Sequence, residues 1–267
     1  MELTTNIVGG KRMRITRLGR EKDSGTFIVP MDHSVTVGPI ADGDGLNRML
    51  DVISRNGADG VVLHAGRARF AEPELFRHLA LIVHLSASTA QAPDTDEKVL
   101  VAQVELALEL GADAVSVHVN LGSDTESAQL ADLGRVAARC TRWGVPLLAM
   151  VYPRGPRIAD PSDPELVAHA ANVAADLGAD MVKTPYTGST ETMTAVVDTC
   201  PIPVFTAGGS RVDGESQLYG SIRQVMRAGA AGVAVGRNVF QAKDVGRVTR
   251  EISDIVHDAS SLKQNIA

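Results

Sequence analysis

The chain has 267 residues, of which 44% are hydrophobic, 22% charged and 3% aromatic, and its formal net charge is -6 at pH 7. This balance is typical of a folded globular protein rather than a disordered chain. Acidic and basic residues are interspersed along the sequence, so the basic surface of a nucleic-acid binder is not expected. No apolar stretch resembles a signal sequence or approaches the ~20 residues of a membrane span, which predicts a cytoplasmic protein without a membrane partner.

From residue 26 onward, short runs rich in Val, Ile and Ala alternate with longer amphipathic segments. This alternation predicts parallel strands that are covered by helices. The predicted strands, in chain order, are Thr26–Met31, Asp59–His64, Ala80–Ser86, Asp113–Val119, Pro146–Tyr152, Asp180–Thr184, Pro203–Ala207 and Gly232–Gly236. The helices predicted between them are Gly45–Asn56, Gly66–Phe76, Glu97–Leu110, Thr125–Trp143, Pro164–Leu177, Thr190–Cys200, Ser216–Ala228 and Asp244–Asp258.

A weak internal repeat supports this count of units. The sequence Gly-Ala-Asp at 57–59, 111–113 and 178–180, and Gly-Ala-Ala at 229–231, each follows a predicted helix and precedes a strand. Glycine ends a helix at low cost because it adopts the left-handed conformation. Eight strand–helix units predict a single (β/α)8 TIM barrel over residues 26–267, preceded by an N-terminal extension of residues 1–25. An open, doubly wound sheet is the alternative.

Lys183 is the clearest candidate for chemistry. The chain has six lysines against twenty arginines, and Lys183 alone interrupts an apolar predicted strand. In TIM barrels the active site lies at the C-terminal ends of the strands, where Lys183 is found. An apolar surrounding disfavours a charged lysine and favours the neutral amine that attacks a carbonyl, so we predict a Schiff-base lysine. The alternative is that Lys183 only neutralises a carboxylate or a phosphate.

Tyr152 and Asp32 end two other predicted strands and are the candidates for proton transfer. Formation of a Schiff base and cleavage or formation of a carbon–carbon bond each require a proton to move to or from an oxygen atom, and a phenol can provide this. Alternatively, Tyr152 is a packed aromatic residue and Asp32 caps the loop that follows it. His33, His118 and Arg154 also lie at strand ends, and we expect them to contact the substrate.

Two glycine-containing loops predict a phosphate site. Gly208, Gly209 and Ser210 follow the seventh predicted strand, and Gly236 and Arg237 follow the eighth. In TIM barrels these two loops often bind phosphate through backbone amides, and Arg237 would add a charged hydrogen bond. Glycines are also common in tight turns that bind nothing.

Metal and disulfide chemistry are not expected. His64, His84 and His118 lie on predicted strands and would converge in a barrel, but none has the spacing of a zinc motif, so hydrogen-bonded core histidines are favoured. His78, His169 and His257 lie on predicted helices or at their ends, and we expect them to face solvent. Cys140 and Cys200 are predicted to be buried, reduced thiols.

The chain resembles the archaeal-type class I fructose-bisphosphate aldolase superfamily over residues 12–258. Within it, the chain is most similar to the branch that makes seven-carbon amino-keto acids. The stretches with this resemblance are Val29–His33, Leu85–Thr89, Ala114–Asn120, Pro146–Pro156, Val182–Thr184, Ala207–Gly209 and Gly236–Phe240. The resemblance implies that Lys183 is the Schiff-base lysine, Tyr152 the proton-transfer residue and Asp32 its acidic partner, with no metal or other cofactor.

The resemblance also implies the substrates. The acceptor would be L-aspartate 4-semialdehyde, and the donor a phosphorylated three-carbon keto unit, either glycerone phosphate or a unit taken from a deoxyketohexose phosphate. The product would serve aromatic or 3-amino-4-hydroxybenzoate biosynthesis, and we expect a homo-oligomer. The alternatives are a fructose-bisphosphate aldolase, a metal-dependent aldolase, and a phosphosugar-binding barrel without catalysis.

Overall fold

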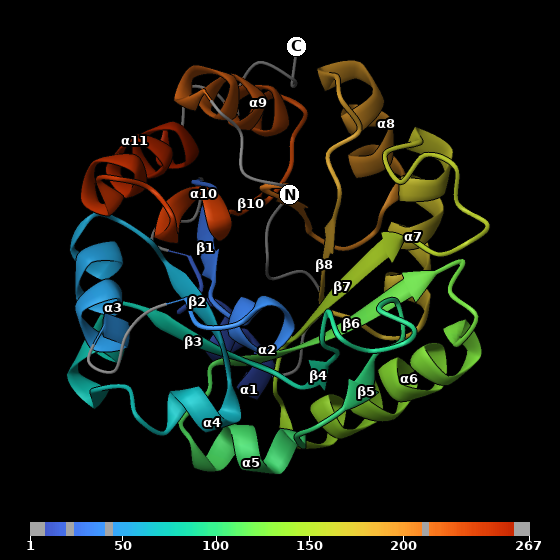
Figure 1. The fold of residues 1–267 in the computed structure, drawn as a ribbon, viewed down its shortest axis with the longest axis horizontal. Coiled ribbons are helices and arrows are strands. Elements are labelled where there is room, and N and C mark those ends of the chain that lie inside the picture. Colours follow the sequence, from blue (N-terminus) through green and yellow to red (C-terminus); the bar gives the residue numbers. More distant parts are fainter. Residues whose placement is uncertain (1–8, 20–23, 41–44, 210–213, 259–267) are drawn as a thin grey trace.

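The predicted barrel is confirmed by the structure, a computed structural model that describes residues 9–19, 24–40, 45–209 and 214–258. Within these residues, eight parallel strands close in the order β1-β10-β9-β8-β7-β6-β3-β2, and helices surround them (Figure 1). Closure of the ring excludes the open, doubly wound sheet. The strands are β1 Thr26–Pro30, β2 Gly60–His64, β3 Ala80–His84, β6 Ala114–Leu121, β7 Leu147–Pro153, β8 Met181–Thr184, β9 Val204–Ala207 and β10 Gly232–Ala234.

The helices follow the prediction except in two places: between β3 and β6, and between β2 and β3, where the helix predicted at Gly66–Phe76 is instead the short helix α4 followed by a 3-10 helix. The outer helices are α3 Gly45–Arg55, α4 Ala65–Ala68, α5 Val104–Glu109, α6 Glu126–Trp143, α7 Pro164–Asp176, α8 Thr190–Thr199, α9 Glu215–Arg227 and α11 Val245–His257, with a 3-10 helix η1 at Pro73–Arg77. Shorter helices are α1 Gly9–Ile15, α2 His33–Val37 and α10 Arg237–Phe240. In the described part of the chain, none is both long and apolar enough to cross a membrane.

The helix predicted to begin at Glu97 is wrong in its first two turns. Residues Ser86–Ala87 (β4) pair antiparallel with Val99–Leu100 (β5), and α5 begins only at Val104. The backbone of this segment pairs with β4 instead of forming helical turns, and the side chain of Val99 is about half exposed. The chain between β4 and β5 instead forms a connection that contributes residues to the cavity described below.

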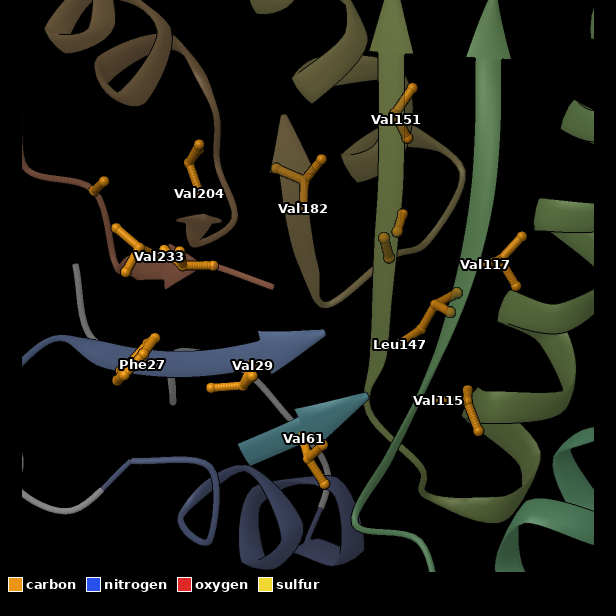
Figure 2. Close-up of a cluster of buried hydrophobic side chains, with 14 of the residues drawn as sticks. Phe27, Val29, Val61, Val115, Val117, Leu147, Val151, Val182, Val204 and Val233 are labelled. Atoms are coloured by element: carbon orange, nitrogen blue, oxygen red, sulfur yellow. The ribbon is translucent and has the colours of Figure 1, made fainter. Parts of the chain in front are cut away.

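Two apolar layers stabilise the barrel, because successive strand residues point to opposite faces. Ile28, Leu148 and Phe205 belong to a buried cluster inside the barrel. Their neighbours Phe27, Leu147 and Val204 belong to a second cluster with the outer helices. Figure 2 shows part of this outer layer, with side chains from β1, β2, β6, β7, β8, β9 and β10. The strands are thus buried on both faces, as their continuous apolar runs predict.

The Gly-Ala-Asp repeat has a structural explanation at the N-terminal ends of the strands. Each aspartate accepts a hydrogen bond from the backbone amide of a residue on the preceding barrel strand, while its own backbone amide donates to the carbonyl of that same residue. The side-chain bonds are Asp59 Oδ2 to Phe27 N (2.7 Å), Asp113 Oδ2 to Leu81 N (3.1 Å) and Asp180 Oδ2 to Leu147 N (2.8 Å). These aspartates therefore fix the register of adjacent strands.

The N-terminal extension packs against this end of the barrel. Lys11 Nζ of α1 lies 2.8 Å from Asp180 Oδ2, and each side chain of the pair is only 10% exposed. Arg17 Nη1 lies 3.1 Å from Asp113 Oδ1, and Leu18 joins the apolar cluster inside the barrel. A lysine in the extension is therefore buried and paired.

Asp59, the remaining aspartate of the repeat, is paired by a histidine of α11. His257 Nε2 of α11 lies 2.8 Å from Asp59 Oδ2, and His257 Nδ1 lies 3.0 Å from Ser253 Oγ. The expectation that His257 faces solvent is therefore wrong.

Cys140 and Cys200 are buried free thiols, as predicted. Burial raises the pKa of Cys140 to about 12, so this thiol stays protonated at neutral pH.

Candidate active site

A cavity of about 750 Å³ opens at the C-terminal ends of the strands. The predicted site residues that the structure describes all line it, namely Asp32, His33, His118, Tyr152, Arg154, Lys183, Gly208, Gly209, Gly236 and Arg237. Ser210 lies outside the described residues. The structure thus brings residues from β1, β6, β7, β8, β9 and β10 to one place, and their individual roles remain predictions.

Lys183 lies on β8 and is 7% exposed. It pairs in register with Met150 of β7 and Phe205 of β9, and its Nζ lies 4.0 Å from Met150 Sδ. Among the described residues, no carboxylate lies within ion-pair distance of Nζ, so a structural ion pair does not account for this lysine. The amine faces the thioether of Met150 and the aromatic ring of Tyr152.

Tyr152 lies two residues after Met150 on β7 and therefore on the same face of the strand. Lys183 Nζ is 5.9 Å from the centre of the Tyr152 ring, and Arg154 Cζ is 5.7 Å from it. The His118 ring packs against Tyr152 at a centroid distance of 4.9 Å. Tyr152 is thus packed and also lines the cavity beside Lys183, so its packing does not exclude proton transfer.

Asp32 follows β1 and is the residue just before α2, but its side chain makes no capping hydrogen bond. Its Oδ1 lies 3.5 Å from His33 Nδ1, and its Oδ2 lies 3.9 Å from His84 Nε2. Burial alone would raise the pKa of Asp32, but His84, His33 and Lys183 outweigh this effect and lower the pKa to about 2. Asp32 is therefore a carboxylate at neutral pH, next to the cavity, rather than a loop cap.

The strand histidines are held neutral by burial. Burial lowers the pKa of His84 to about 4, although the Asp32 carboxylate acts in the opposite direction, and His84 Nδ1 lies 2.8 Å from Ser116 Oγ. Burial also lowers the pKa values of His64 and His118.

These histidines are engaged with different neighbours. The rings of His64 and His84 lie 5.2 Å apart, whereas His118 Nε2 lies 2.9 Å from Asn120 Oδ1. In the described part of the chain, no group of three or more His, Cys, Asp or Glu side chains is arranged to hold a metal ion.

The two glycine loops lie side by side and are joined by side chains that follow β10. Arg237 Nη2 donates to the Gly209 carbonyl (2.9 Å), and Asn238 Nδ2 donates to the Gly208 carbonyl (3.0 Å). Packing explains two of the glycines, because a Cβ on Gly208 would lie 2.9 Å from Val235 and one on Gly236 2.5 Å from the Pro30 carbonyl. Gly209 has a φ of +67°, which side chains rarely adopt.

Unpartnered polar atoms mark the cavity as a site for a polar ligand. Asp32 Oδ1, His33 Nδ1 and Arg237 Nε are buried without a hydrogen-bond partner among the described residues. A buried polar atom without a partner costs roughly 1–3 kcal/mol, so a ligand that supplies the missing bonds gains affinity. These atoms lie on the β1 and β10 side of the cavity.

Two further residues shape this region, and of these Lys98 was not expected there from the sequence. Asn238 ties the loops together, and Lys98, in the β4–β5 connection, lines the cavity as a half-buried cation. Burial lowers the pKa of Lys98, and the charge of Arg154 lowers it further. The only sequence signal for Lys98 was the scarcity of lysine, because the surrounding segment was assigned to a helix.

Comparisons with known proteins agree with this arrangement. The family model for DeoC/LacD family aldolases matches residues 26–242. A Streptomyces griseus protein named 2-amino-4,5-dihydroxy-6-oxo-7-(phosphonooxy)heptanoate synthase is 49% identical over 259 residues, which cover 97% of this chain and 94% of that protein. A Halobacterium salinarum protein named 2-amino-3,7-dideoxy-D-threo-hept-6-ulosonate synthase is 43% identical over 249 residues, which cover 93% and 92%.

A solved structure shows the same fold with an intermediate in place. An archaeal fructose-1,6-bisphosphate aldolase, whose catalytic lysine is covalently bound to the carbinolamine intermediate of the substrate, superposes with a TM-score of 0.85 and 29% sequence identity. The match covers 93% of this chain and 99% of that chain. A covalent lysine intermediate is thus documented for a protein of this architecture.

Proposed function

Because the chain belongs to the DeoC/LacD family of aldolases, we propose that it is a lysine Schiff-base aldolase that joins glycerone phosphate to L-aspartate 4-semialdehyde. The observation on which this rests is Lys183, a buried lysine that lines the cavity and has no carboxylate partner among the described residues. The reaction needs no cofactor, since the protonated imine on Lys183 acts as the electron sink.

The names of the two relatives indicate the substrates. The S. griseus product has seven carbons, an amino group at carbon 2, a keto group at carbon 6 and a phosphate at carbon 7. Bond formation between carbons 4 and 5 makes such a product from a four-carbon amino acid aldehyde and a three-carbon keto phosphate. The H. salinarum product name contains no phosphate, which fits a donor unit released from a phosphorylated sugar. The higher identity to the first relative favours glycerone phosphate.

Lys183 and Tyr152 would perform the chemistry. The neutral amine attacks the donor carbonyl, and loss of water from the carbinolamine gives a protonated imine. Removal of a proton from the adjacent hydroxymethyl carbon gives an enamine, whose carbon attacks the acceptor aldehyde. Tyr152, whose ring centre lies 5.9 Å from Lys183 Nζ, would use its hydroxyl to move protons to and from the reacting oxygens. Hydrolysis of the resulting imine releases the product and restores Lys183.

Asp32 would stabilise the charged intermediate. Because its pKa is about 2, it is ionised throughout the physiological range and is a weak general acid there. The charge of Lys183 lowers the pKa of Asp32 because the two groups are close together. At the same short range, the Asp32 carboxylate would stabilise the positive charge of an imine on Lys183. The neutral state of His84 leaves this negative charge without a permanent counter-ion on that side.

The donor phosphate would bind on the β9 and β10 side of the cavity. Gly208 and Gly209 end one loop and Gly236 and Arg237 begin the other, and this pair of loops is the usual phosphate site in TIM barrels. Arg237 Nε is buried and unpartnered, so it is available to an anion, while its Nη2 is held by the Gly209 carbonyl. His33, beside the same loops, would contact the donor as well.

Fructose-bisphosphate aldolase is the less favoured activity. The archaeal fructose-1,6-bisphosphate aldolase of known structure is 29% identical in sequence to this chain, whereas the two synthases are 49% and 43% identical. A fructose-bisphosphate aldolase would accept glyceraldehyde 3-phosphate, a second phosphorylated substrate. Turnover with that aldehyde in place of aspartate semialdehyde would favour it.

Trapping of the imine tests the proposal. Borohydride should inactivate the enzyme only in the presence of glycerone phosphate, and mass analysis should place the reduced adduct on Lys183. Lys183→Arg keeps the charge but offers no neutral amine, so it should give no adduct and no turnover while still folding. Chelators should not change the rate. An adduct on another lysine, or an active arginine variant, would show that Lys183 is not the nucleophile.

Donor identity needs a separate assay. Aspartate semialdehyde is supplied with either glycerone phosphate or a deoxyketohexose phosphate, and the product is identified by mass. A product that retains phosphate supports the proposed donor, and a product without it assigns the second donor. The cytoplasmic location and the homo-oligomeric state belong to the same proposal and are checked by cell fractionation and by light scattering.

A further inference from the structure

Three charged residues line the cavity away from the glycine loops and have no role in the chemistry described above. Lys98 and Asp96 lie in the β4–β5 connection, and Arg154 follows β7. They lie near one another, because the charge of Arg154 lowers the pKa of Lys98 and the charge of Asp96 raises it, after the larger lowering by burial. Two cations and one carboxylate thus share one side of the cavity.

This group also lies close to the reacting lysine. Arg154 Cζ is 5.7 Å from the centre of the Tyr152 ring, and Lys183 Nζ is 5.9 Å from the same centre. Lys98 is near enough to His118, which packs on Tyr152, to contribute to lowering the pKa of His118. A small molecule that reaches Lys183 can therefore contact this side of the cavity at the same time.

The connection that holds Lys98 is fixed by backbone contacts. The Asp96 carbonyl accepts hydrogen bonds from Asn120 Nδ2 (2.8 Å) and Gln129 Nε2 (3.0 Å). Lys98 Nζ donates to the Thr95 carbonyl at 2.7 Å. The side chain of Asp96 does not take part in the bonds from Asn120 and Gln129, so a substitution there leaves both anchors in place. The backbone at Asp96 and the amine of Lys98 are thus positioned before any ligand binds, which favours affinity.

We propose that Lys98, Arg154 and Asp96 bind the amino-acid end of the acceptor, with the two cations on its carboxylate and Asp96 on its ammonium group. The inference rests on the proposed function and assigns the acceptor side of that site. An amino acid aldehyde has one negative and one positive group next to each other, which matches two cations beside one carboxylate. A phosphorylated aldehyde would bring its doubly charged phosphate against Asp96 instead.

Steady-state kinetics of Lys98→Met test the carboxylate contact. Loss of a charged hydrogen bond should raise the KM for aspartate semialdehyde roughly tenfold or more. The KM for glycerone phosphate and the borohydride trapping of Lys183 should stay at the wild-type level, because neither involves the acceptor. Lys98→Arg should retain most of the acceptor affinity. Lys243→Met, at an exposed lysine away from the cavity, is the matched control and should change neither KM.

An acceptor without an amino group tests Asp96. The wild-type enzyme should use 4-oxobutanoate, which keeps the carboxylate and the aldehyde, at least tenfold less efficiently in kcat/KM than aspartate semialdehyde. Asp96→Asn should lower kcat/KM for aspartate semialdehyde and leave that for 4-oxobutanoate unchanged, so the preference shrinks. An equal loss with both acceptors would contradict an ammonium contact.

The outcomes separate this inference from the proposed function. If glycerone phosphate gives no adduct on wild-type Lys183, the Schiff-base function is wrong, whatever the Lys98 variant does. If the adduct forms and Lys98→Met leaves the acceptor KM unchanged, the acceptor subsite is wrong and the function stands. If Lys98→Met raises the KM values of donor and acceptor equally, Lys98 stabilises the loop or binds the donor phosphate, which also overturns the inference.

Discussion

His84 and Asp32 lie beside each other, 3.9 Å apart at their closest nitrogen and oxygen, and their ionisation predicts how stability depends on pH. His84 has a pKa of about 4 in the folded protein, against 6.5 for an ordinary histidine. Between these values the unfolded chain binds a proton that the folded protein does not, so stability falls as pH falls. The contribution of His84 is fully present above pH 6.5, and roughly 2 kcal/mol of it is lost by pH 5.

The substitution His84→Asn isolates this contribution. We expect the free energy of unfolding of the wild-type protein to fall between pH 7 and pH 5 by roughly 2 kcal/mol more than that of the variant. Comparing each protein with itself at two pH values removes the direct cost of the substitution. Asp32 does not interfere, because its pKa of about 2 keeps it ionised over this window.

Urea denaturation at the two pH values is the assay, and His169→Asn, at an exposed histidine on α7, is the control. The control should show the same pH dependence as the wild type. A pH dependence of His84→Asn within about 0.5 kcal/mol of the wild-type value would refute the claim that burial holds His84 neutral.

Three further substitutions test the site and the barrel. Tyr152→Phe should slow turnover on the order of 10²-fold without unfolding the protein, and wild-type turnover would make Tyr152 a packing residue. Arg237→Ala should raise the KM for the phosphorylated donor about tenfold, and an unchanged value would remove Arg237 from the site. Lys11→Met leaves the buried Asp180 carboxylate without its ion-pair partner, so the free energy of unfolding measured by urea denaturation should fall by about 3–5 kcal/mol. A fall of less than about 1 kcal/mol would contradict the buried pair.

Much of the barrel could be predicted from the sequence because the signals for its strands are local. Each strand is a short run of apolar residues that is buried on both faces, and Gly-Ala-Asp marks the start of three of them. The predicted boundaries lie within two residues of the observed ones for most strands. The repeat was interpreted only through glycine, whereas the structure shows that its aspartates bond to neighbouring strands.

The parts that could not be predicted depend on long-range contacts. The connection that contains Lys98 has no periodic apolar pattern, and its position is set by Asn120 and Gln129 from a later strand and helix. The burial of Lys11 depends on Asp180, 169 residues away in the chain. Lys183 was recognisable because one charged residue interrupts a buried strand, a pattern that is visible within four residues.

The ion pairs at the N-terminal end of the barrel have a consequence for how the chain folds during its synthesis. β1 pairs with β10, and Asp59 pairs with His257, 198 residues later. Until β10 leaves the ribosome, one edge of β1 stays open, and until α11 follows it, the Asp59 carboxylate lacks its histidine. Contacts of such sequence separation slow folding, and an open strand edge favours association with other chains. We therefore expect nascent chains that end before β10 to be the species that aggregates and requires chaperones.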